Sequence, residues 1–163
     1  MDIFINAGVG TGKTLLSAFD GALQDAGVYN YNLITLSSVI PPRSHIQIRK
    51  FQEKKDEFGY KLYVVKSEVR SGVKGTYIGA AIGWYQKKDG SGLFVEHHEE
   101  GKTALVVKSK LEKDVYASLS DLCERRRFAY SKKQCKIHLI ARKVEDTPMC
   151  VLVLAVYQSE GWK

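Results

Sequence analysis

The chain has 163 residues, of which 44% are hydrophobic and 26% charged, and this length and composition predict a single globular domain over residues 1–163. Its apolar runs are far too short to cross a bilayer and no basic leader opens the sequence, so we expect a cytoplasmic protein with no membrane partner. The net charge of +7 is spread over clusters near residues 49–55 and 125–133 that lie beside acidic residues or in predicted turns, which favours a solvated surface over nucleic-acid binding.

The first predicted strand, Ile3–Ile5, is followed by the glycine-rich segment Ala7–Thr14 and then a helix. With alanine in its first position, this segment matches a relaxed form of the P-loop, in which backbone N–H groups hold a phosphate. A P-loop fold also needs parallel strands joined by helices and an acidic magnesium ligand that ends a later apolar strand. The later sequence shows neither feature. A nucleotide-binding protein using Gly8 to Thr14 is therefore the alternative interpretation.

Residues 14–25 are predicted to form a helix, because apolar residues recur on one face at spacings of three and four. These residues are Leu16, Phe19, Leu23 and Ala26. Gly27 is expected to end the helix. Asp20 lies beside the apolar stripe, where a carboxylate needs either solvent or a partner. A solvated helix acid and a functional carboxylate both remain open.

An apolar, strand-like run begins at Leu33, continues through Ser37-Ser38 and Val39-Ile40, and ends at Pro41 and Pro42. Because Pro41 and Pro42 cannot donate to a sheet or continue a helix, a buried strand is predicted to stop near the serines. On these residues alone, an ordinary turn before a proline loop is the favoured interpretation.

The order and spacing of four segments closely resemble those of the pyruvoyl-dependent arginine decarboxylase family. The segments are Leu16–Leu23, Ala26-Gly27, Asn30–Ile34 and Ser37–Pro42. The resemblance implies that Ser38 Oγ attacks the carbonyl of Ser37 and that the chain cleaves itself into residues 1–37 and 38–163. Residue 38 would become a pyruvoyl group, which supplies the electron sink that decarboxylation requires without PLP or a metal.

The same resemblance implies that arginine is converted to agmatine and carbon dioxide, and it suggests roles for three further residues. Asp20 would meet the cationic end of the substrate, and Asn32 would assist self-cleavage. Tyr31 would lie near the substrate in place of a smaller residue. An unprocessed or altered-substrate member of the family is a second alternative.

The segment 43–59 is predicted to be an irregular loop with a brief edge strand at Ile46 and Ile48, and the ranges 60–69, 76–86 and 93–98 are predicted to be three successive antiparallel strands. Glu96 matches the family's Gly-Leu-x-x-Glu, whose glutamate acts as the acid of the catalytic cycle. A metal site at His97-His98-Glu99-Glu100 is disfavoured, because adjacent residues of a strand point to opposite faces.

The range 103–127 is predicted to be the longest helix, and 135–140 and 151–157 the last two strands. His138 is expected on the surface. The three cysteines are odd in number and lack C-x-x-C spacing, so neither a disulfide framework nor a zinc site is predicted. The order of elements predicts an α+β fold, a four-layer αββα sandwich with antiparallel or mixed sheets. The resemblance implies the same fold and a homotrimer, or a hexamer built as a pair of trimers, with active sites between subunits.

Overall fold

The computed structural model describes residues 1–163, which form two α-helices, nine strands and two short 3₁₀ helices. The elements are β1 (Asp2–Thr11), α1 (Leu15–Asp25), β2 (Asn32–Thr35), β3 (Val39–Ile40), β4 (His45–Ile48), η1 (Lys55–Glu57), β5 (Lys61–Ser71), β6 (Tyr77–Gln86), β7 (Gly92–Gly101), α2 (Ala104–Arg125), η2 (Lys132–Gln134), β8 (Cys135–Lys143) and β9 (Met149–Glu160). Neither helix combines the length and the apolarity that crossing a bilayer requires.

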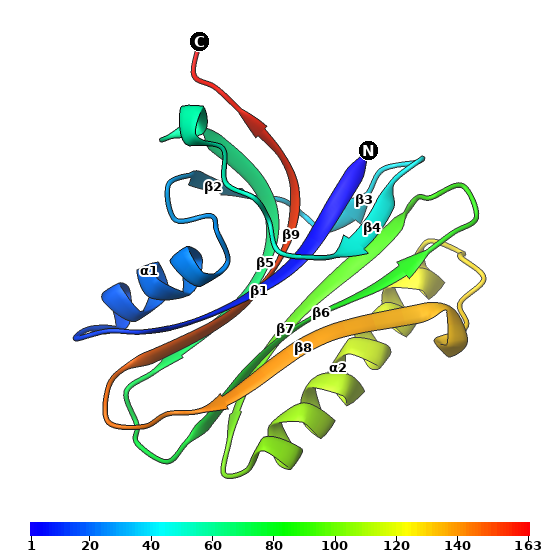
Figure 1. Ribbon diagram of the computed structural model, residues 1–163. Coiled ribbons are helices and arrows are strands. Elements are labelled where there is room, and N and C mark those ends of the chain that lie inside the picture. Colours follow the sequence, from blue (N-terminus) through cyan, green and yellow to red (C-terminus); the bar gives the residue numbers. More distant parts are fainter.

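Two sheets pack face to face, and one helix covers the outer face of each (Figure 1). The first sheet has the order β2-β5-β9-β1-β4 and is mixed, because its two edge strands pair in parallel with their neighbours. The second sheet has the order β3-β7-β6-β8 and is antiparallel throughout. The predicted α+β, four-layer αββα sandwich is confirmed.

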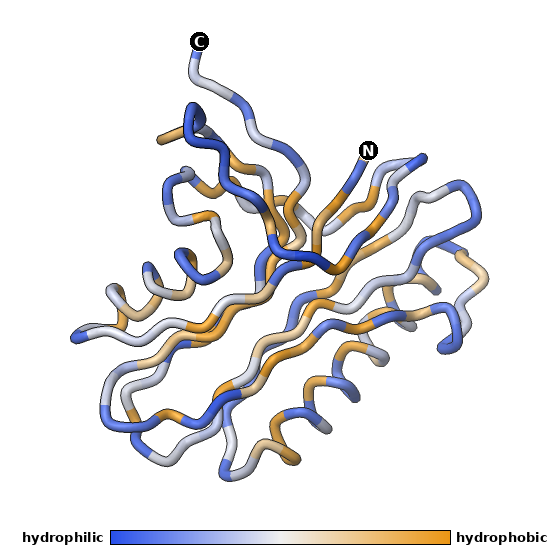
Figure 2. Tube along the Cα trace, in the orientation of Figure 1, coloured by the Kyte–Doolittle hydropathy of each residue, from blue (hydrophilic) through white to orange (hydrophobic).

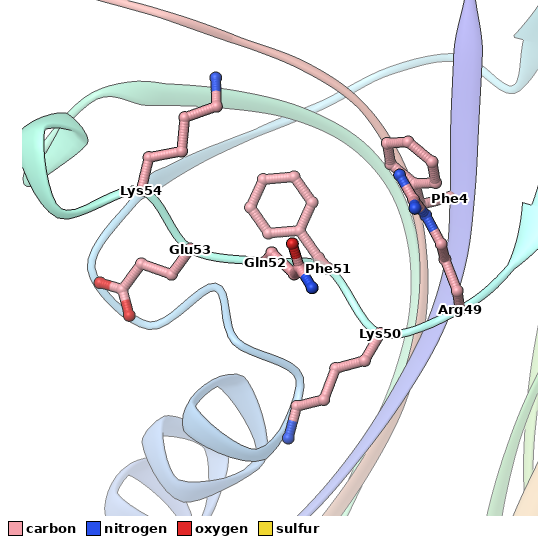
Figure 3. Close-up of a pocket in the computed structure, with 7 residues that line it drawn as sticks. All are labelled: Phe4, Arg49, Lys50, Phe51, Gln52, Glu53 and Lys54. Carbon is pink, nitrogen blue, oxygen red and sulfur yellow. The ribbon is translucent and has the colours of Figure 1, made fainter.

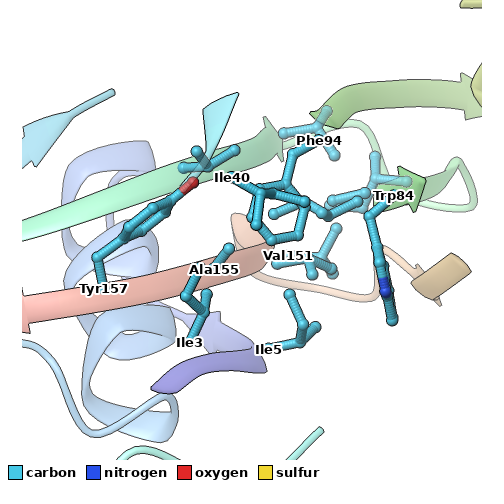
Figure 4. Close-up of a cluster of buried hydrophobic side chains, with 14 of the residues drawn as sticks. Ile3, Ile5, Ile40, Trp84, Phe94, Val151, Ala155 and Tyr157 are labelled. Atoms are coloured by element: carbon cyan, nitrogen blue, oxygen red, sulfur yellow. The ribbon is translucent and has the colours of Figure 1, made fainter. Parts of the chain in front are cut away.

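Apolar side chains fill the three spaces between the four layers. The largest cluster lies between the sheets and includes Ile3, Ile5, Phe94 and Tyr157 (Figure 4). Figure 2 shows the apolar residues concentrated along the central strands, while polar residues dominate the loops and the outer side of α2. Burial of apolar surface in these layers is the main force that holds the two sheets together.

Strand β1 runs through most of the segment that matches a P-loop, so the predicted end of this strand at Ile5 is wrong. Gly8 and Gly10 pair with residues of β9. A Cβ atom at Gly10 would lie 2.1 Å from the backbone nitrogen of Ala22 in α1, and one at Gly8 would lie 2.1 Å from the Ala22 carbonyl oxygen. These glycines therefore allow the helix backbone to pack directly on the strand.

Helix α1 is confirmed, with Thr14 as its N-cap and Gly27, at φ +74°, just after its end. Its buried face differs from the predicted stripe. Leu16 is 70% exposed, whereas the small residues Ala18 and Ala22 are fully buried. The reason is the close contact with the β1 glycines, which only small side chains permit.

The apolar run before the prolines is not one strand. It divides into β2 at the edge of the first sheet and β3 at the edge of the second, and of residues 33–40 only Ile40 is buried. The three strands predicted between residues 60 and 98 also divide, because β5 pairs with β9 and β2 while only β6 and β7 form a hairpin.

The C-terminal half agrees more closely with the sequence pattern. The helix predicted over 103–127 is confirmed as α2, which buries Val107, Leu111, Val115 and Leu119. The three cysteines are free thiols, two of them buried. The prediction of a surface His138 is wrong, since its side chain is half-buried and burial lowers its pKa.

Candidate active site

The chain crosses from one sheet to the other at Leu36, Ser37 and Ser38. The N–H of Leu36 donates to Val64 of β5 in the first sheet over 2.8 Å, and the carbonyl of Ser38 accepts from the N–H of Phe94 of β7 in the second sheet, also over 2.8 Å. Packed sheets lie about 10 Å apart, and three extended residues reach at most about 10 Å. The three residues of the crossing therefore have little length to spare.

Ser38 occupies the left-handed region, with φ +66°. This region is unfavourable for a residue with a Cβ, and such strain is often found where a structure does chemistry. The Ser38 hydroxyl donates a hydrogen bond to Oε1 of Glu96. The strained backbone at Ser38 thus lies beside the Ser37–Ser38 peptide bond, and the hydroxyl that is predicted to attack this bond has a hydrogen-bond acceptor in Glu96.

Glu96 reaches Ser38 because both belong to one edge of the second sheet. Val39 pairs with Leu93 in the β3–β7 ladder, and Phe94 and Glu96 point to the same face of β7, two residues apart. The first residue anchors the backbone of Ser38 and the second contacts its hydroxyl. Strand pairing therefore positions the two predicted site residues, Ser38 and Glu96, side by side.

A cavity of about 410 Å³ opens beside the serine pair. Its lining includes Ser37, Val39, Tyr63 and Tyr157, and the remaining residues are Met1, Leu36, Pro41 and Gln158. Most of these side chains are apolar. Neither Ser38 nor Glu96 lines it, but its wall includes Ser37 and Val39 on either side of Ser38. Such a space can hold a small molecule beside this segment.

Tyr157 is a residue of this site that the sequence did not reveal. Its hydroxyl donates to the carbonyl oxygen of Val39 over 3.0 Å, across 118 residues of sequence. It closes an apolar run that indicates only a buried strand, so no local signal points to it. Only the packing of the two sheets against each other brings it to the serine pair.

Asn32 and Tyr31 contribute to a different group of contacts, at the start of β2. The Asn32 side-chain amide donates to the carbonyl of Gly59 over 2.6 Å. The Tyr31 hydroxyl, in a side chain only 7% exposed, donates to Glu57 Oε2 over 2.9 Å. Neither side chain forms a hydrogen bond with the serine pair within this chain. Their roles in cleavage and substrate binding stay predictions.

The contacts around Glu57 are charged as well as polar. Lys54 Nζ lies 2.7 Å from Glu57 Oε1. Burial alone would raise the pKa of Glu57, but hydrogen bonds from Lys54, Ser159 and Tyr31 outweigh it and lower the pKa below its ordinary value. Burial is also the largest cause that raises the pKa of Tyr31 to about 12. This group, which we call the Glu57 clasp (Tyr31, Lys54, Glu57 and Ser159), ties the start of β2 to the loop before β5 and to β9.

Asp20 lies on the exposed side of α1, on the outer face of the first sheet. No hydrogen bond or ion pair joins it to another residue of the chain. A single chain therefore does not bring Asp20 to the serine pair, which lies between the two sheets.

The histidines of β7 point to opposite faces of the strand, as their adjacent positions require. His97 contacts α2, where its Nε2 lies 2.9 Å from Ser118 Oγ, and burial lowers its pKa. The chain contains no group of three or more histidine, cysteine or acidic side chains able to hold a metal ion.

A second cavity, of about 290 Å³, lies away from the serines on the outer side of the first sheet (Figure 3). It is formed by Phe4 of β1 and the loop 49–54, and the Arg49 guanidinium stacks over the Phe4 ring at 4.1 Å. Its cationic side chains reach solvent, and it contains none of the predicted site residues.

Comparisons with known proteins agree with this geometry. A family model described as pyruvoyl-dependent arginine decarboxylase matches residues 2–161. Pyruvoyl-dependent arginine decarboxylases of Thermoplasma volcanium and Picrophilus torridus are 38% and 33% identical to the chain over 69% and 62% of its length. That of Methanocaldococcus jannaschii is 40% identical over 67%. The matched segments span 63%, 57% and 62% of these relatives' own lengths.

Proposed function

The chain belongs to the pyruvoyl-dependent arginine decarboxylase family, and from this premise we propose that it cleaves itself between Ser37 and Ser38 and then decarboxylates arginine to agmatine. One observation carries the proposal: Ser38, in a left-handed conformation where the chain crosses between the sheets, donates a hydrogen bond from its hydroxyl to Glu96. No finding favours nucleotide binding at Gly8 to Thr14, since β1 and α1 fill that space.

The position of Ser38 supports the proposed self-cleavage. Its Oγ forms a bond to the carbonyl carbon of Ser37 and the C–N bond of that peptide breaks, which leaves an ester between the two residues. Glu96 accepts the hydroxyl hydrogen bond and so orients the nucleophile. β-Elimination then frees residues 1–37 with a carboxylate end, and hydrolysis of the new residue 38 releases ammonia and leaves a pyruvoyl group.

The residues present fit a pyruvoyl group at position 38. The carbonyl that would become its amide is already held by the Phe94 N–H, and the cavity beside it has room for a small substrate. When present, the group withdraws electrons from the substrate carbon that loses carbon dioxide. In this proposal Glu96, which is partly buried and hydrogen-bonded to residue 38, returns a proton to that carbon.

The cavity is completed by a second copy of the chain in this proposal. Apolar side chains around the serine pair are exposed in a single chain, with Val39 at 54%, Met1 at 42% and Ile34 at 37%. An exposed apolar patch of this kind is typical of an interface. A homotrimer, or a pair of trimers, would cover it and bring Asp20 of a neighbour to the guanidinium of arginine, which pairs well with a carboxylate. The free cysteines are consistent with a cytoplasmic location.

Intact mass tests the self-cleavage. We expect the purified protein to give a fragment ending at Ser37 and one beginning with pyruvoyl at 38, and Ser38→Ala to give only the full-length chain. A wild type that stays uncut under all conditions would overturn the proposal.

A mixing experiment tests the shared site. Ser38→Ala lacks the nucleophile but keeps Asp20, and Asp20→Ala keeps the nucleophile but lacks the carboxylate. If Asp20 acts across the interface, the two coexpressed variants should release carbon dioxide from arginine, although each alone releases little. Lysine, ornithine and histidine serve as comparison substrates. Equal inactivity of the mixture and of its components would show that Asp20 does not act across the interface.

A further inference from the structure

The peptide units that follow Ser38 are held by two hydrogen bonds, one from each sheet. Phe94 N–H of the second sheet donates to the Ser38 carbonyl over 2.8 Å. The Tyr157 hydroxyl of the first sheet donates to the Val39 carbonyl over 3.0 Å. Two consecutive carbonyls are therefore fixed from opposite sides, directly next to the bond that is cleaved.

Tyr157 is itself rigidly placed. It is 8% exposed, and its ring packs edge-on against Phe94, with the centroids 6.2 Å apart and the planes at 73°. Figure 4 shows its oxygen directed toward the strand that carries Ile40. The ring contacts the same residue whose N–H holds Ser38, so both anchors move together.

The hydroxyl of Tyr157 is a permanent donor. Burial is the main cause that raises its pKa, and the nearby Glu96 carboxylate raises it further. The group therefore stays protonated at neutral pH. A constant donor suits the fixing of a backbone carbonyl rather than the exchange of protons.

Resting on the proposed function, we propose that Tyr157 is a positioning residue for residue 38, both before and after cleavage. Before cleavage, its bond to Val39 keeps the short strand β3 in place and so maintains the left-handed Ser38 that directs Oγ toward Glu96. After cleavage, residue 38 loses its covalent link to Ser37. The carbonyl anchors at residues 38 and 39 and the β3 pairing then set where the pyruvoyl group stands.

Tyr157→Phe tests this role, because it removes the hydroxyl and keeps the ring against Phe94. The matched control is Tyr85→Phe. Tyr85 is also buried and its hydroxyl also donates to a backbone carbonyl, that of Ala129, over 2.9 Å, but it lies on the α2 side of the second sheet. Both variants should lose similar stability in urea.

The two variants should differ in rate. We expect Tyr157→Phe to self-cleave at least tenfold more slowly than wild type, and its processed form to show a lower kcat with a KM within about twofold of wild type. Tyr85→Phe should match wild type in all three quantities. Equal cleavage rates and equal kcat in both variants would overturn the inference.

A measurement on uncut protein separates this inference from the proposed function. In a Ser38→Ala background, Tyr157→Phe should speed amide hydrogen exchange at Phe94 and at β3, while Tyr85→Phe should leave these amides unchanged. If wild type never cleaves, the proposed function fails, yet the exchange data still decide whether Tyr157 holds this segment. Unchanged exchange at Phe94 in the Tyr157 variant would show that it does not.

Discussion

Two short stretches in the first quarter of the chain, residues 7–14 and 33–42, both look like functional motifs, and the fold uses them in opposite ways. At Gly8 and Gly10 the missing side chains make room for the backbone of α1. At Ser37 and Ser38 the chain crosses from the first sheet to the second, and a cavity opens beside it. The first stretch is a packing contact and the second is the proposed reactive site.

The difference lies in what occupies the space that small residues create. A glycine can serve a phosphate or a neighbouring helix, since either needs a close approach to the backbone. Only the three-dimensional contacts separate the two uses. At the serine pair, a strained residue, an oriented hydroxyl and an open cavity coincide, which is the combination expected of a site of chemistry.

The largest predicted effect is on the turnover of arginine, and it is expected from a change at Glu96 beside the serine stretch. Glu96→Gln keeps an oxygen that can accept the Ser38 hydrogen bond, so self-cleavage should proceed. Glutamine cannot donate an acidic proton, and turnover of arginine should fall by roughly 10²–10⁴-fold. Carbon dioxide release measured on fully cleaved protein checks the expectation.

Glu99→Gln is the matched control, because Glu99 lies on the same strand but on the face turned away from Ser38. It should retain wild-type turnover. A cleaved Glu96→Gln protein with normal turnover would assign the proton transfer to another group.

A smaller effect, on stability rather than rate, is expected at the packing contact. Gly10→Ala places a Cβ 2.1 to 2.4 Å from backbone atoms of α1, and overpacking against backbone should cost roughly 3 kcal/mol or more in the free energy of unfolding. Urea denaturation measures it. Gly72→Ala, whose Cβ would meet nothing closer than 3.9 Å, is the control.

The same contact can be tested as a nucleotide site. Lys13→Ala should leave stability unchanged, since Lys13 is exposed. Neither wild type nor Lys13→Ala should bind ATP at millimolar concentration in calorimetry. Binding that Lys13→Ala abolished would show that residues 8–14 act as a P-loop after all.

The elements that could be predicted from sequence are those whose periodicity is long and regular. Helix α2 and strand β9 follow from repeated apolar positions, and the stop at Gly27 follows from its local conformation. Strand partners could not be predicted in the same way. The separation of β5 from β6, and the division of the run at 33–40 between two sheets, depend on contacts between distant residues.

The site shows the same limit. The pairing of Ser38 with Glu96 was reached through resemblance to a family, since 58 residues separate them. Tyr157 was missed, because a tyrosine that ends an apolar strand is common and its partner is a backbone carbonyl. Leu16 was assigned to the core because the helical spacing allows it, while the β1 glycines in fact select alanines for that contact.

The smallest effect concerns pH, and it separates the two stretches by their chemistry. The start of β2, which leads into the serine stretch, is held by the Glu57 clasp and so depends on a carboxylate. The glycine contact is made of backbone and methyl groups. In the folded protein the pKa of Glu57 lies below its ordinary value of 4.5, since hydrogen bonds to Lys54, Ser159 and Tyr31 outweigh the effect of burial. Protonation of this carboxyl is thus harder in the folded than in the unfolded chain. The clasp therefore contributes stability above about pH 4.5, and this contribution is lost as pH falls through the folded-state pKa.

Glu57→Gln removes the charge but keeps the size of the side chain. At neutral pH we expect wild type to be modestly more stable than this variant in urea, and the difference to shrink as the pH is lowered from 6 to 3. Amide exchange should locate the loss at the start of β2, around Asn32, where the clasp acts, and not in α1. If Glu57→Gln loses as much stability in acid as wild type does, other carboxylates account for the loss. The segment before the serine pair would then be held by packing alone, like the contact at the glycines.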